Sequence, residues 1–429
     1  MKNFRDYDRS QRLLLPPDLR DWVRDDDLAH FICDAVERVD ITAFHISRTG
    51  SGKAQYHPRM MLALLIYCYA RGIFSSRKIE AATHCNVSVR YVAANSHPDH
   101  DTIAKFRRDN AAAFSHAFEH VLLLASETGL LQLGTVSVDG TKIDANASKI
   151  KSIRYDRIQV LRAKLSEDIA ALVAQAEAAD NAPQEDGLTL PSKIARREVL
   201  KAKLDAAAAR LEAAARGDDD DDASPPPPGP HPEGTQQTNL TDPDSAVMRK
   251  STRHEYRQAY NAQAIVDADG SMLVLATDVL CTSNDRPSLP VMLDRMAIRG
   301  DIPKTLLADA GYAGQAVIEQ ITRRNITPLI SVSREQAPRP YDFKPPPTRA
   351  KQPKAITAPW RLEMIETLKK QPAKNLYKLR KQTVEPVFGI IKSAIGFTQF
   401  SMRGIEKVKA EWQLITLAYN CKRLAKLTA

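Results

Sequence analysis

The sequence predicts an α/β protein, in which a layered domain of strands and helices follows an all-helical N-terminal region. Three observations predict this fold class. Apolar residues recur at helical spacing over about the first 125 residues. From Leu133 onward, short apolar runs typical of strands alternate with helical segments. Between two of these runs, Asp269 and Gly270 form the kind of turn that joins the strands of a hairpin.

The N-terminal region is expected to contain helices at 28–39, 58–71, 76–85 and 102–128. Pro58 suits the first turn of a helix, and Gly72 and Gly129 suit positions just beyond a helix end. The order of helices is compatible with a DNA-binding module, in which basic side chains could face phosphate or simply solvent. These side chains are Arg77, Lys78, Arg90, Lys105, Arg107 and Arg108.

The α/β domain is expected to occupy 129–429, after a helical DNA-binding domain at 1–128. The apolar patterns predict its elements in chain order. They are a strand at 133–139, a hairpin of strands at 255–267 and 271–280, a helix at 285–298, a strand ending at Asp309, a helix at 314–324 and a strand at 327–332.

A long interruption at 146–250 separates the first two of these strands. It contains two Ala-rich, charged helical stretches at 155–179 and 190–216, followed by an Asp run at 218–222 and a Pro run at 225–228. Acidic and Pro runs do not build hydrophobic cores, so the sequence predicts an inserted helical arm with a flexible Asp/Pro-rich tether. A second Pro-rich, basic stretch at 337–359 follows the last expected strand.

The net charge of this 429-residue chain is +9, and the basic charge is concentrated near the C-terminus. Residues 339–429 hold 19 Lys and Arg against 6 Asp and Glu, so the rest of the chain is slightly acidic. Clustered cations favour a polyanion such as DNA, because binding releases counterions condensed on the phosphates. An ordinary soluble basic surface is the alternative.

Neither a membrane segment nor a disulfide framework is predicted. The longest apolar run, 60–70, is too short to span a bilayer, and the first ten residues lack the apolar core of a signal peptide. The five cysteines are far apart and include no Cys-x-x-Cys pair, which favours reduced thiols. We therefore expect a cytoplasmic protein without a membrane partner.

Two apolar runs each end on an aspartate. Asp139 follows the run Thr-Val-Ser-Val and precedes Gly140. Asp309 follows the run Thr-Leu-Leu-Ala and lies two residues before Gly311. Each pattern predicts a buried strand that delivers a carboxylate where it surfaces, with the glycine opening a turn. Ordinary turn aspartates are the alternative for either residue alone.

A third carboxylate, Glu385, lies in a basic segment far downstream. If 377–396 is largely helical, Lys378, Lys381 and Lys392 share a face with it. That face suits a metal ligand beside a polyanion, or equally a solvated, salt-bridged surface. Because Pro386 removes a backbone donor, the helix is expected to begin near Glu385 or to be kinked there. Three gathered carboxylates can hold two divalent ions against a phosphate.

Two other motifs suggest different chemistry. His116, Glu119 and His120 match the H-x-x-E-H pattern of a zinc peptidase, but no third ligand is identifiable, and a helix surface is favoured instead. The stretch 50–53 resembles the end of a phosphate-binding loop, but Ala54 replaces the hydroxyl residue that would hold Mg²⁺, which excludes that function.

Taken together, these segments resemble the DDE transposases of bacterial insertion sequences, in particular the group whose Glu helix carries a Tyr, Arg, Glu, Lys signature. The resemblance covers most of the chain, and its combination of blocks is specific whereas any one block is weak. The helical blocks are YHPRMMLALLIYCYARGIFSSRKIE and PDHDTIAKFRRDN. The catalytic blocks are VSVDGTKIDANAS, DPDSAVM, YRQAYNAQAIVD, LADAGY and YKLRKQTVEPVFGIIK.

The resemblance implies an RNase H-like mixed-sheet catalytic domain that performs metal-dependent DNA cleavage and strand transfer with two Mg²⁺ or Mn²⁺ ions. Carried over position by position, the catalytic and metal-binding triad is Asp139, Asp309 and Glu385. Tyr377, Arg380 and Lys392 match the signature residues that contact DNA phosphates. Four residues rather than the usual three separate Arg380 from Glu385, so Lys381 is an alternative in the Arg role.

The expected partner is double-stranded DNA, namely the terminal inverted repeats of the element and the target, bound by a homodimer. Three alternatives stay open on the sequence. The chain could be a catalytically inactive DNA-binding relic, a zinc metallopeptidase, or an RNase H-like nuclease that cuts DNA without joining it.

Overall fold

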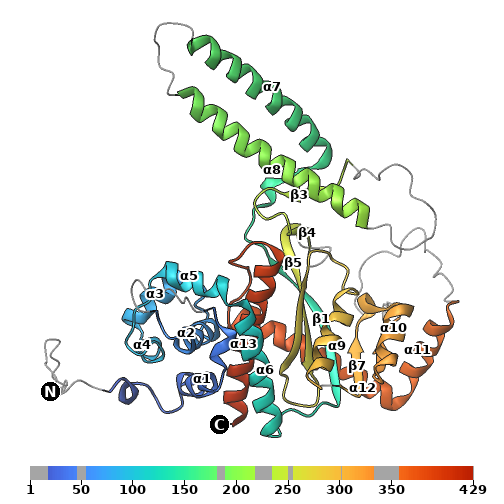
Figure 1. The fold of residues 1–429 in the computed structure, drawn as a ribbon. Helices are drawn as coiled ribbons and strands as arrows, with labels where there is room; N and C mark the ends of the chain where they lie inside the picture. The colour runs from blue at the N-terminus through green and yellow to red at the C-terminus, as the bar shows by residue number, and fades with distance from the viewer. Residues whose placement is uncertain are drawn as a thin grey trace, which may run out of the picture.

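Figure 1 shows the fold in a computed structural model of the chain. The structure describes residues 18–45, 55–180, 189–217, 234–249, 255–300, 302–332 and 357–428. A mixed β-sheet lies between helices, the N-terminal helices pack to one side of it, and a helical hairpin projects away from it (Figure 1). The α/β class and the helical N-terminal region are as predicted.

Among the described residues the main sheet has six strands in the order β4-β5-β1-β7-β8, with β6 also paired with β5. The central strand β1 (Thr135–Asp144) is antiparallel to β5 (Arg257–Asp267) and parallel to β7 (Thr305–Ala308). β8 (Thr327–Ile330) continues the parallel half, while β4 (Ala246–Met248) and β6 (Val274–Leu280) pair antiparallel with β5. An antiparallel hairpin beside parallel strands is the RNase H-like arrangement that the resemblance implied.

Helices cover both faces of this sheet. α9 (Ser288–Ile298) connects β6 to β7, and α10 (Gln315–Arg323) connects β7 to β8, as parallel strands require. α9 and α13 (Ile405–Thr428) both pack against β6 and flank the sheet on opposite sides (Figure 1). Burial on both faces explains why β5 is apolar or amide-rich along its length instead of alternating.

The N-terminal helices surround α2 (Pro58–Ala70), in which every residue from Met61 to Ala70 is buried. The other helices are α1 (Leu28–Glu37), α3 (Ser76–Cys85), α4 (Val87–Val92), α5 (His100–Asp109) and α6 (Ala111–Glu127). The single helix predicted at 102–128 is wrong, because the chain breaks at Asn110 into α5 and α6. There Asn110 Oδ1 accepts a hydrogen bond from the His45 N–H at 2.8 Å.

α13 joins these helices to the sheet, and it is absent from the sequence-based predictions. Its buried side chains, Trp412 foremost, contact α2 and α6 as well as β6, so one hydrophobic core runs without a break from α1 to α13. Trp412 Nε1 donates to the backbone oxygen of Gln263 in β5 at 2.9 Å. The predicted division at residues 128 and 129 falls between α6 and β1, and both parts share this core.

Arg107 is one of the six basic side chains for which phosphate or solvent contact was open, and it has neither. It is 8% exposed, and its Nη1 donates to the Tyr69 hydroxyl at 2.8 Å and to the Phe74 carbonyl at 3.1 Å. Tyr69 in turn donates to Glu411 of α13 at 3.3 Å. The expectation of an exposed Arg107 is therefore wrong, because the Tyr69 hydroxyl and the Phe74 carbonyl hold it inside, with the buried carboxylate of Glu411 on the far side of Tyr69.

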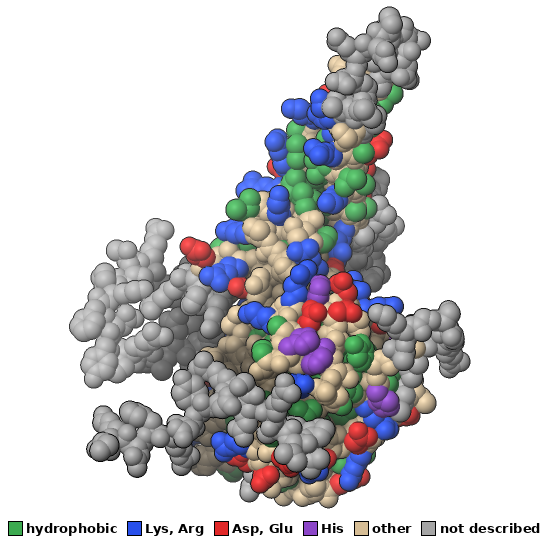
Figure 2. All heavy atoms as spheres, turned by 90° about the vertical axis from the view of Figure 1, so that its left-hand side faces the viewer, with side chains coloured by type: hydrophobic (Ala, Val, Ile, Leu, Met, Phe, Trp, Pro, Cys, Tyr) green, Lys and Arg blue, Asp and Glu red, His purple; other side chains and the backbone are tan. Residues whose placement is uncertain are grey.

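The inserted arm consists of α7 (Tyr155–Asp180) and α8 (Thr189–Gly217), close to the predicted ranges, packed as a hairpin (Figure 1). It has a hydrophobic cluster of its own, which includes Ile158, Leu165 and Leu204. A small antiparallel sheet of β2 (Ser152–Arg154) and β3 (Gln237–Asn239) lies at its base. Lys and Arg side chains are prominent along the described part of the arm (Figure 2).

Several sequence expectations lie outside the described residues. They are the Asp/Pro-rich tether at 218–228, the stretch at 50–53, and all but the last three residues of the Pro-rich stretch at 337–359. A helix that was not predicted, α11 (Pro359–Lys369), begins at the end of that stretch and packs on α12 (Gln371–Gly389).

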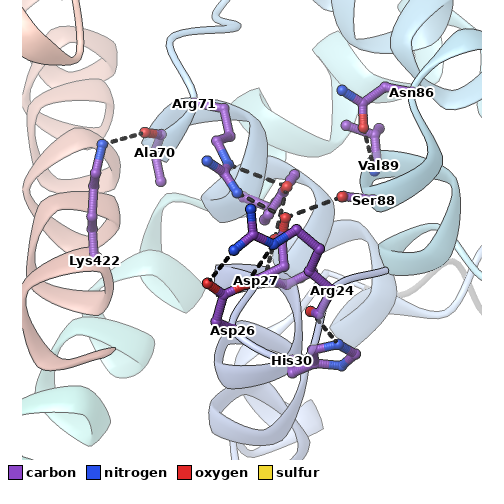
Figure 3. A network of polar contacts seen from close by, with 12 residues as sticks. Arg24, Asp26, Asp27, His30, Ala70, Arg71, Asn86, Ser88, Val89 and Lys422 are labelled. Carbon is purple, nitrogen blue, oxygen red and sulfur yellow. Dashed lines mark hydrogen bonds and ion pairs between the residues drawn. The ribbon is translucent and has the colours of Figure 1, made fainter. Parts of the chain in front are cut away.

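Asp27 ties the N-terminal helices together (Figure 3). Its carboxylate caps α1 by accepting from the Ala29 N–H at 2.9 Å, and it accepts from the Tyr67 hydroxyl at 3.0 Å and Arg71 Nη2 at 2.9 Å. Ser88 of α4 donates to it at 3.2 Å. Burial alone would raise the pKa of Asp27, but these donors outweigh it and hold the pKa below its usual value.

Replacing Asp27 with Ala should lower the unfolding free energy by about 2 kcal/mol at pH 7, because a cap and an ionic partner are lost together. The folded-state pKa is depressed, so the stabilisation is present above the ordinary carboxyl pKa and is lost as the pH falls below it. The gap between the two proteins should thus close below about pH 4 in denaturant unfolding. Asp26→Ala, which removes only an exposed pair with Arg24, is the control, and an equal loss there would contradict the prediction.

Candidate active site

Asp139 lies in the centre of the main sheet. Val136, Ser137 and Val138 before it are fully buried, and its own side chain is 21% exposed. The predicted strand end at Asp139 is wrong, since β1 stays paired with β5 as far as Asp144. The carboxylate therefore projects from within a strand, which fixes its position more firmly than a turn would.

Gly140 is not a turn residue either. It pairs with Gln263 in the ladder between β1 and β5. A Cβ atom at this position would lie 2.1 Å from Gln263 Nε2 and 2.8 Å from Asn261 Oδ1. Glycine is needed here because amide side chains from β5 fill the space beside the strand.

Asp309 follows β7 directly, as predicted. β1 and β7 pair in register, with Ser137 opposite Leu307, so Asp139 and Asp309 occupy equivalent positions two residues further along adjacent parallel strands. Such strands lie about 4.8 Å apart, and strand alternation places both side chains on the same face. Asp309 Oδ1 accepts from the Gly311 N–H at 2.8 Å, which confirms the expected turn at Gly311.

Glu385 lies on α12, which packs against β1, β5 and β7. Its neighbours Val384 and Val387 are buried against the sheet, while the Glu385 side chain is 51% exposed. The helix begins well before Glu385, at Gln371, and Pro386 lies inside it. The expected start near Glu385 is therefore wrong. Beyond Gly389 the helix widens into a π-helical turn over Ile390–Ala394, so the ideal helical register used for Lys392 does not hold.

Arg380 joins two of the predicted acids. Its Nη1 lies 3.2 Å from Asp139 Oδ2, and its Nη2 lies 3.7 Å from Glu385 Oε1. The Arg380 side chain is only 12% exposed, so its contact with Asp139 is largely shielded from water, while Glu385 is half exposed. Lys381 is exposed on the helix surface, and within the described part of the chain it forms no ion pair with either acid. Arg380 is therefore the cation that reaches the carboxylates.

The other two signature residues contact the strands that carry the aspartates. The Tyr377 hydroxyl donates to the backbone oxygen of Ala308, the residue before Asp309, at 3.1 Å. Lys392 Nζ donates to Thr141 Oγ1 at 2.5 Å and to the Lys142 carbonyl at 2.7 Å, both on β1. These contacts anchor α12 and the π-turn over the edge at which Asp139 and Asp309 meet.

The electrostatics of this edge are unfavourable for the anions on their own. Burial first, and then the neighbouring Asp309 and Asp285, raise the pKa of Asp139 to about 6 against the opposing effects of the Gly140 N–H and Arg380. Carboxylate oxygens are the ligands that Mg²⁺ and Mn²⁺ prefer, and a buried pair of like charges gains from a divalent cation. Arg380 now supplies part of that positive charge, so the residues present fit such an ion.

No three His, Cys, Asp or Glu side chains of the described residues are gathered tightly enough to bind one metal ion together. The H-x-x-E-H residues are no exception. His116 and Glu119 are exposed on α6, and His120 is half-buried beside them. The predicted triad is spread over the edge of the sheet as Asp139 and Asp309 side by side, with Glu385 connected through Arg380.

Asp285 is a fourth acid at this edge that the sequence reasoning missed. The predicted helix at 285–298 begins with it, but α9 begins at Ser288, and the loop before α9 turns Asp285 toward Asp139 and Asp309. The strand order could have indicated the position of Asp285. β6 runs parallel to β1, so an acid soon after β6 emerges at the same edge as the two predicted aspartates.

Comparison with known families agrees with this geometry. The sequence profile described as "Transposase DDE domain" matches residues 233–421, and that described as "Transposase domain (DUF772)" matches residues 17–109. The first match contains Asp309 and Glu385, while Asp139 precedes it. No curated protein and no solved structure shows significant similarity.

A helical N-terminal region followed by an RNase H-like mixed sheet is the arrangement of the DDE class of nucleic-acid-processing proteins. With both profile matches, the chain belongs to the DDE transposases of insertion sequences, and it is thus a DNA transposase rather than a peptidase. In the described part of the chain, no helix is long and apolar enough to cross a lipid bilayer.

Replacing Asp139 with Asn should stabilise the metal-free protein at neutral pH, by on the order of 1–3 kcal/mol, because a buried charge beside Asp309 is removed. The folded-state pKa is raised to about 6, so the folded protein holds the proton more tightly than the unfolded chain. The stability that the wild-type protein gains from this tighter proton binding is complete below the pKa of Asp139 in the unfolded chain, and it is lost as the pH rises through about 6.

The gain from Asn should accordingly develop between pH 4 and 6 when unfolding is followed by denaturant titration in chelator. Asp144→Asn is a matched control on the same strand, since Asp144 is 37% exposed and pairs with Arg257 at the surface. If Asp139→Asn were less stable than the wild-type protein at pH 7, the prediction would be wrong, because the charged Asp139 would then be stable in the site without a bound metal ion.

Proposed function

We propose that this transposase binds the ends of its insertion sequence and performs metal-dependent DNA strand cleavage and strand transfer. The observation that carries the proposal is the placement of Asp139 and Asp309 side by side on parallel strands, with Arg380 connecting Asp139 to Glu385. The two members of the predicted triad that lie in the matched range, Asp309 and Glu385, belong to this arrangement.

In this proposal Asp139, Asp309 and Glu385 hold two Mg²⁺ or Mn²⁺ ions. When bound, such ions activate an attacking water or 3′-hydroxyl and stabilise the leaving oxygen of an in-line displacement. The role of the sheet is to keep the two aspartates adjacent despite their repulsion, so that their charge is available to the ions without rearrangement.

Arg380 and Lys392 would bind phosphate oxygens as negative charge develops on them. Arg380 is now held by Asp139 and Glu385, and neutralising these carboxylates would free its guanidinium for the phosphate. Lys392 already lies beside β1, and Tyr377 holds α12 on the strand that delivers Asp309. These four signature positions thus act from one helix and the turn that follows it.

DNA binding is supported by the exposed face of α12. Lys374, Lys378 and Lys381 follow one another at separations of four and three, and Glu385 continues the row four residues later. A row of cations leading to the acids would guide a phosphate backbone into the site. Two DNA ends must meet for strand transfer, so we propose a homodimer on DNA formed with the terminal inverted repeats and the target.

The decisive experiment incubates purified protein with a linear fragment that carries the flanking inverted repeats, with and without Mg²⁺. We expect metal-dependent nicking at the repeat ends by the wild-type protein and none by Asp139→Asn or Asp309→Asn, while both variants still shift the DNA on a gel. Asp294→Asn on α9, which pairs with Arg324 at the surface, should cut normally. Undiminished cutting by Asp139→Asn would remove that residue from the mechanism, and uncut DNA with every protein would indicate an inactive binding relic.

Arg380 and Lys381 can be separated by the same assay. Arg380→Ala should reduce the cleavage rate by roughly 100-fold, because it removes the cation that reaches both the acids and the phosphate. Lys381→Ala should weaken DNA binding only slightly and leave the rate at saturating DNA within about threefold. The reverse ranking would assign the signature position to Lys381.

A further inference from the structure

Asp285 is held in the site by one of its two carboxylate oxygens. Oδ1 accepts from Asn261 Nδ2 at 2.6 Å and from Gln263 Nε2 at 2.9 Å, both on β5. Lys142 Nζ of β1 lies 3.8 Å from the same oxygen. Gln263 is fixed in turn by a hydrogen bond from the Tyr312 hydroxyl. Three elements of the sheet edge therefore orient this carboxylate.

The other oxygen, Oδ2, faces Asp309. A Cβ atom at Gly311 would lie 2.8 Å from Asp285 Oδ2 and 2.9 Å from Asp309 Oδ1, so both oxygens border the space that this glycine leaves open. A Cβ atom at Gly140 would lie 2.9 Å from Asp285 Oδ1. The glycines that follow the two predicted aspartates thus make room for the same third carboxylate.

Asp285 Oδ2 has no hydrogen-bond donor among the described residues, and no described Lys or Arg forms an ion pair with Asp309. Arg380 offsets charge only at Asp139 and Glu385. Lys142 is paired with the other oxygen of Asp285, so the two carboxylates that face each other here are only partly compensated, which is unfavourable in a partly buried site. The acids therefore form two pairs. Arg380 joins one of them, whereas Lys142 lies 3.8 Å from Asp285 Oδ1 and, among the described residues, forms no ion pair with Asp309.

We propose that Asp285 is a fourth metal-binding carboxylate, which together with Asp309 binds one of the two ions of the site. Mg²⁺ is commonly held by one or two carboxylates plus substrate phosphate, which suits two pairs of acids better than one compact triad. Asn261 and Gln263 fix Oδ1 and leave Oδ2 available. This inference rests on the proposed function and assigns it a residue outside the predicted triad.

The test is Mn²⁺ binding to the DNA-free protein, measured by calorimetry and by the electron paramagnetic resonance signal of free Mn²⁺. Asp285→Asn keeps an oxygen for Asn261 and Gln263 but removes the charge. We expect it to weaken binding of one ion about tenfold or more without lowering the unfolding temperature in chelator. Asp294→Asn, which neutralises a surface acid on α9, is the control and should bind as the wild-type protein does.

A second variant leaves every charge in place. Gly311→Ala puts a methyl group between Asp285 Oδ2 and Asp309 Oδ1 and forces them apart, so it should also weaken Mn²⁺ binding. Gly389→Ala, where nothing lies within 4 Å of the added carbon, should not. This pair decides the question even if Asp285→Asn folds poorly.

Asp309→Asn distinguishes the metal-binding role proposed for Asp285 from the existence of the proposed metal site. Loss of Mn²⁺ binding in Asp309→Asn but not in Asp285→Asn and Gly311→Ala would overturn the role of Asp285 alone and leave it as a brace for β5. Wild-type Mn²⁺ binding in all three variants would overturn the proposed metal site itself. Loss in all three would support both.

Discussion

The parallel pairing of β1 with β7 is the constraint on which the site depends. It sets Asp139 and Asp309 at equivalent positions on adjacent strands, where their mutual repulsion and burial would otherwise drive them apart. A side chain on a central strand cannot move away without breaking the ladder on both sides, and β1 is paired along its length with β5 as well. The energy for holding two anions together thus comes from the apolar core and hydrogen bonding of the sheet, not from the site.

The rest of the fold keeps the helix of Glu385 against this edge. The segment after the π-turn runs beside the end of β1. The Asp144 N–H donates to the Thr398 carbonyl at 3.1 Å, and the Phe400 N–H donates to the Asp144 carbonyl at 2.9 Å. The Ser401 N–H donates to Glu411 at 2.9 Å. Glu411 is fully buried, and its charge is offset through Tyr69 by Arg107 of α5. A buried charge network of this kind is costly when one partner is removed, so the N-terminal helices and the sheet edge that carries Asp139 and Asp309 are energetically joined.

Much of this could be predicted from the sequence, and the failures have physical causes. Apolar runs located β1, β5, β6, β7 and β8 because strands buried on both faces are continuously apolar, and the arm was found from its composition. Where β1 ends could not be predicted, since Gly140 and Thr141 resemble a turn locally and are kept in the strand only by pairing with β5. The break at Asn110 and the burial of Arg107 likewise depend on partners far away in the chain. Asp285 escaped notice for the same reason, because its neighbours in space are not its neighbours in sequence.

Asp139 precedes the matched profile, and a long insertion separates its strand, β1, from β5. The arm has its own hydrophobic cluster, and β2 pairs with β3 at its base, so both ends of the insertion leave the core close together. A closed insertion of this type adds little strain to the sheet, because the entropic cost of a longer connection rises only slowly with its length. More than a hundred residues lie between β1 and β5, yet the two strands pair in one continuous register. The first carboxylate is therefore positioned by strand pairing alone, independently of how the chain between the two strands varies.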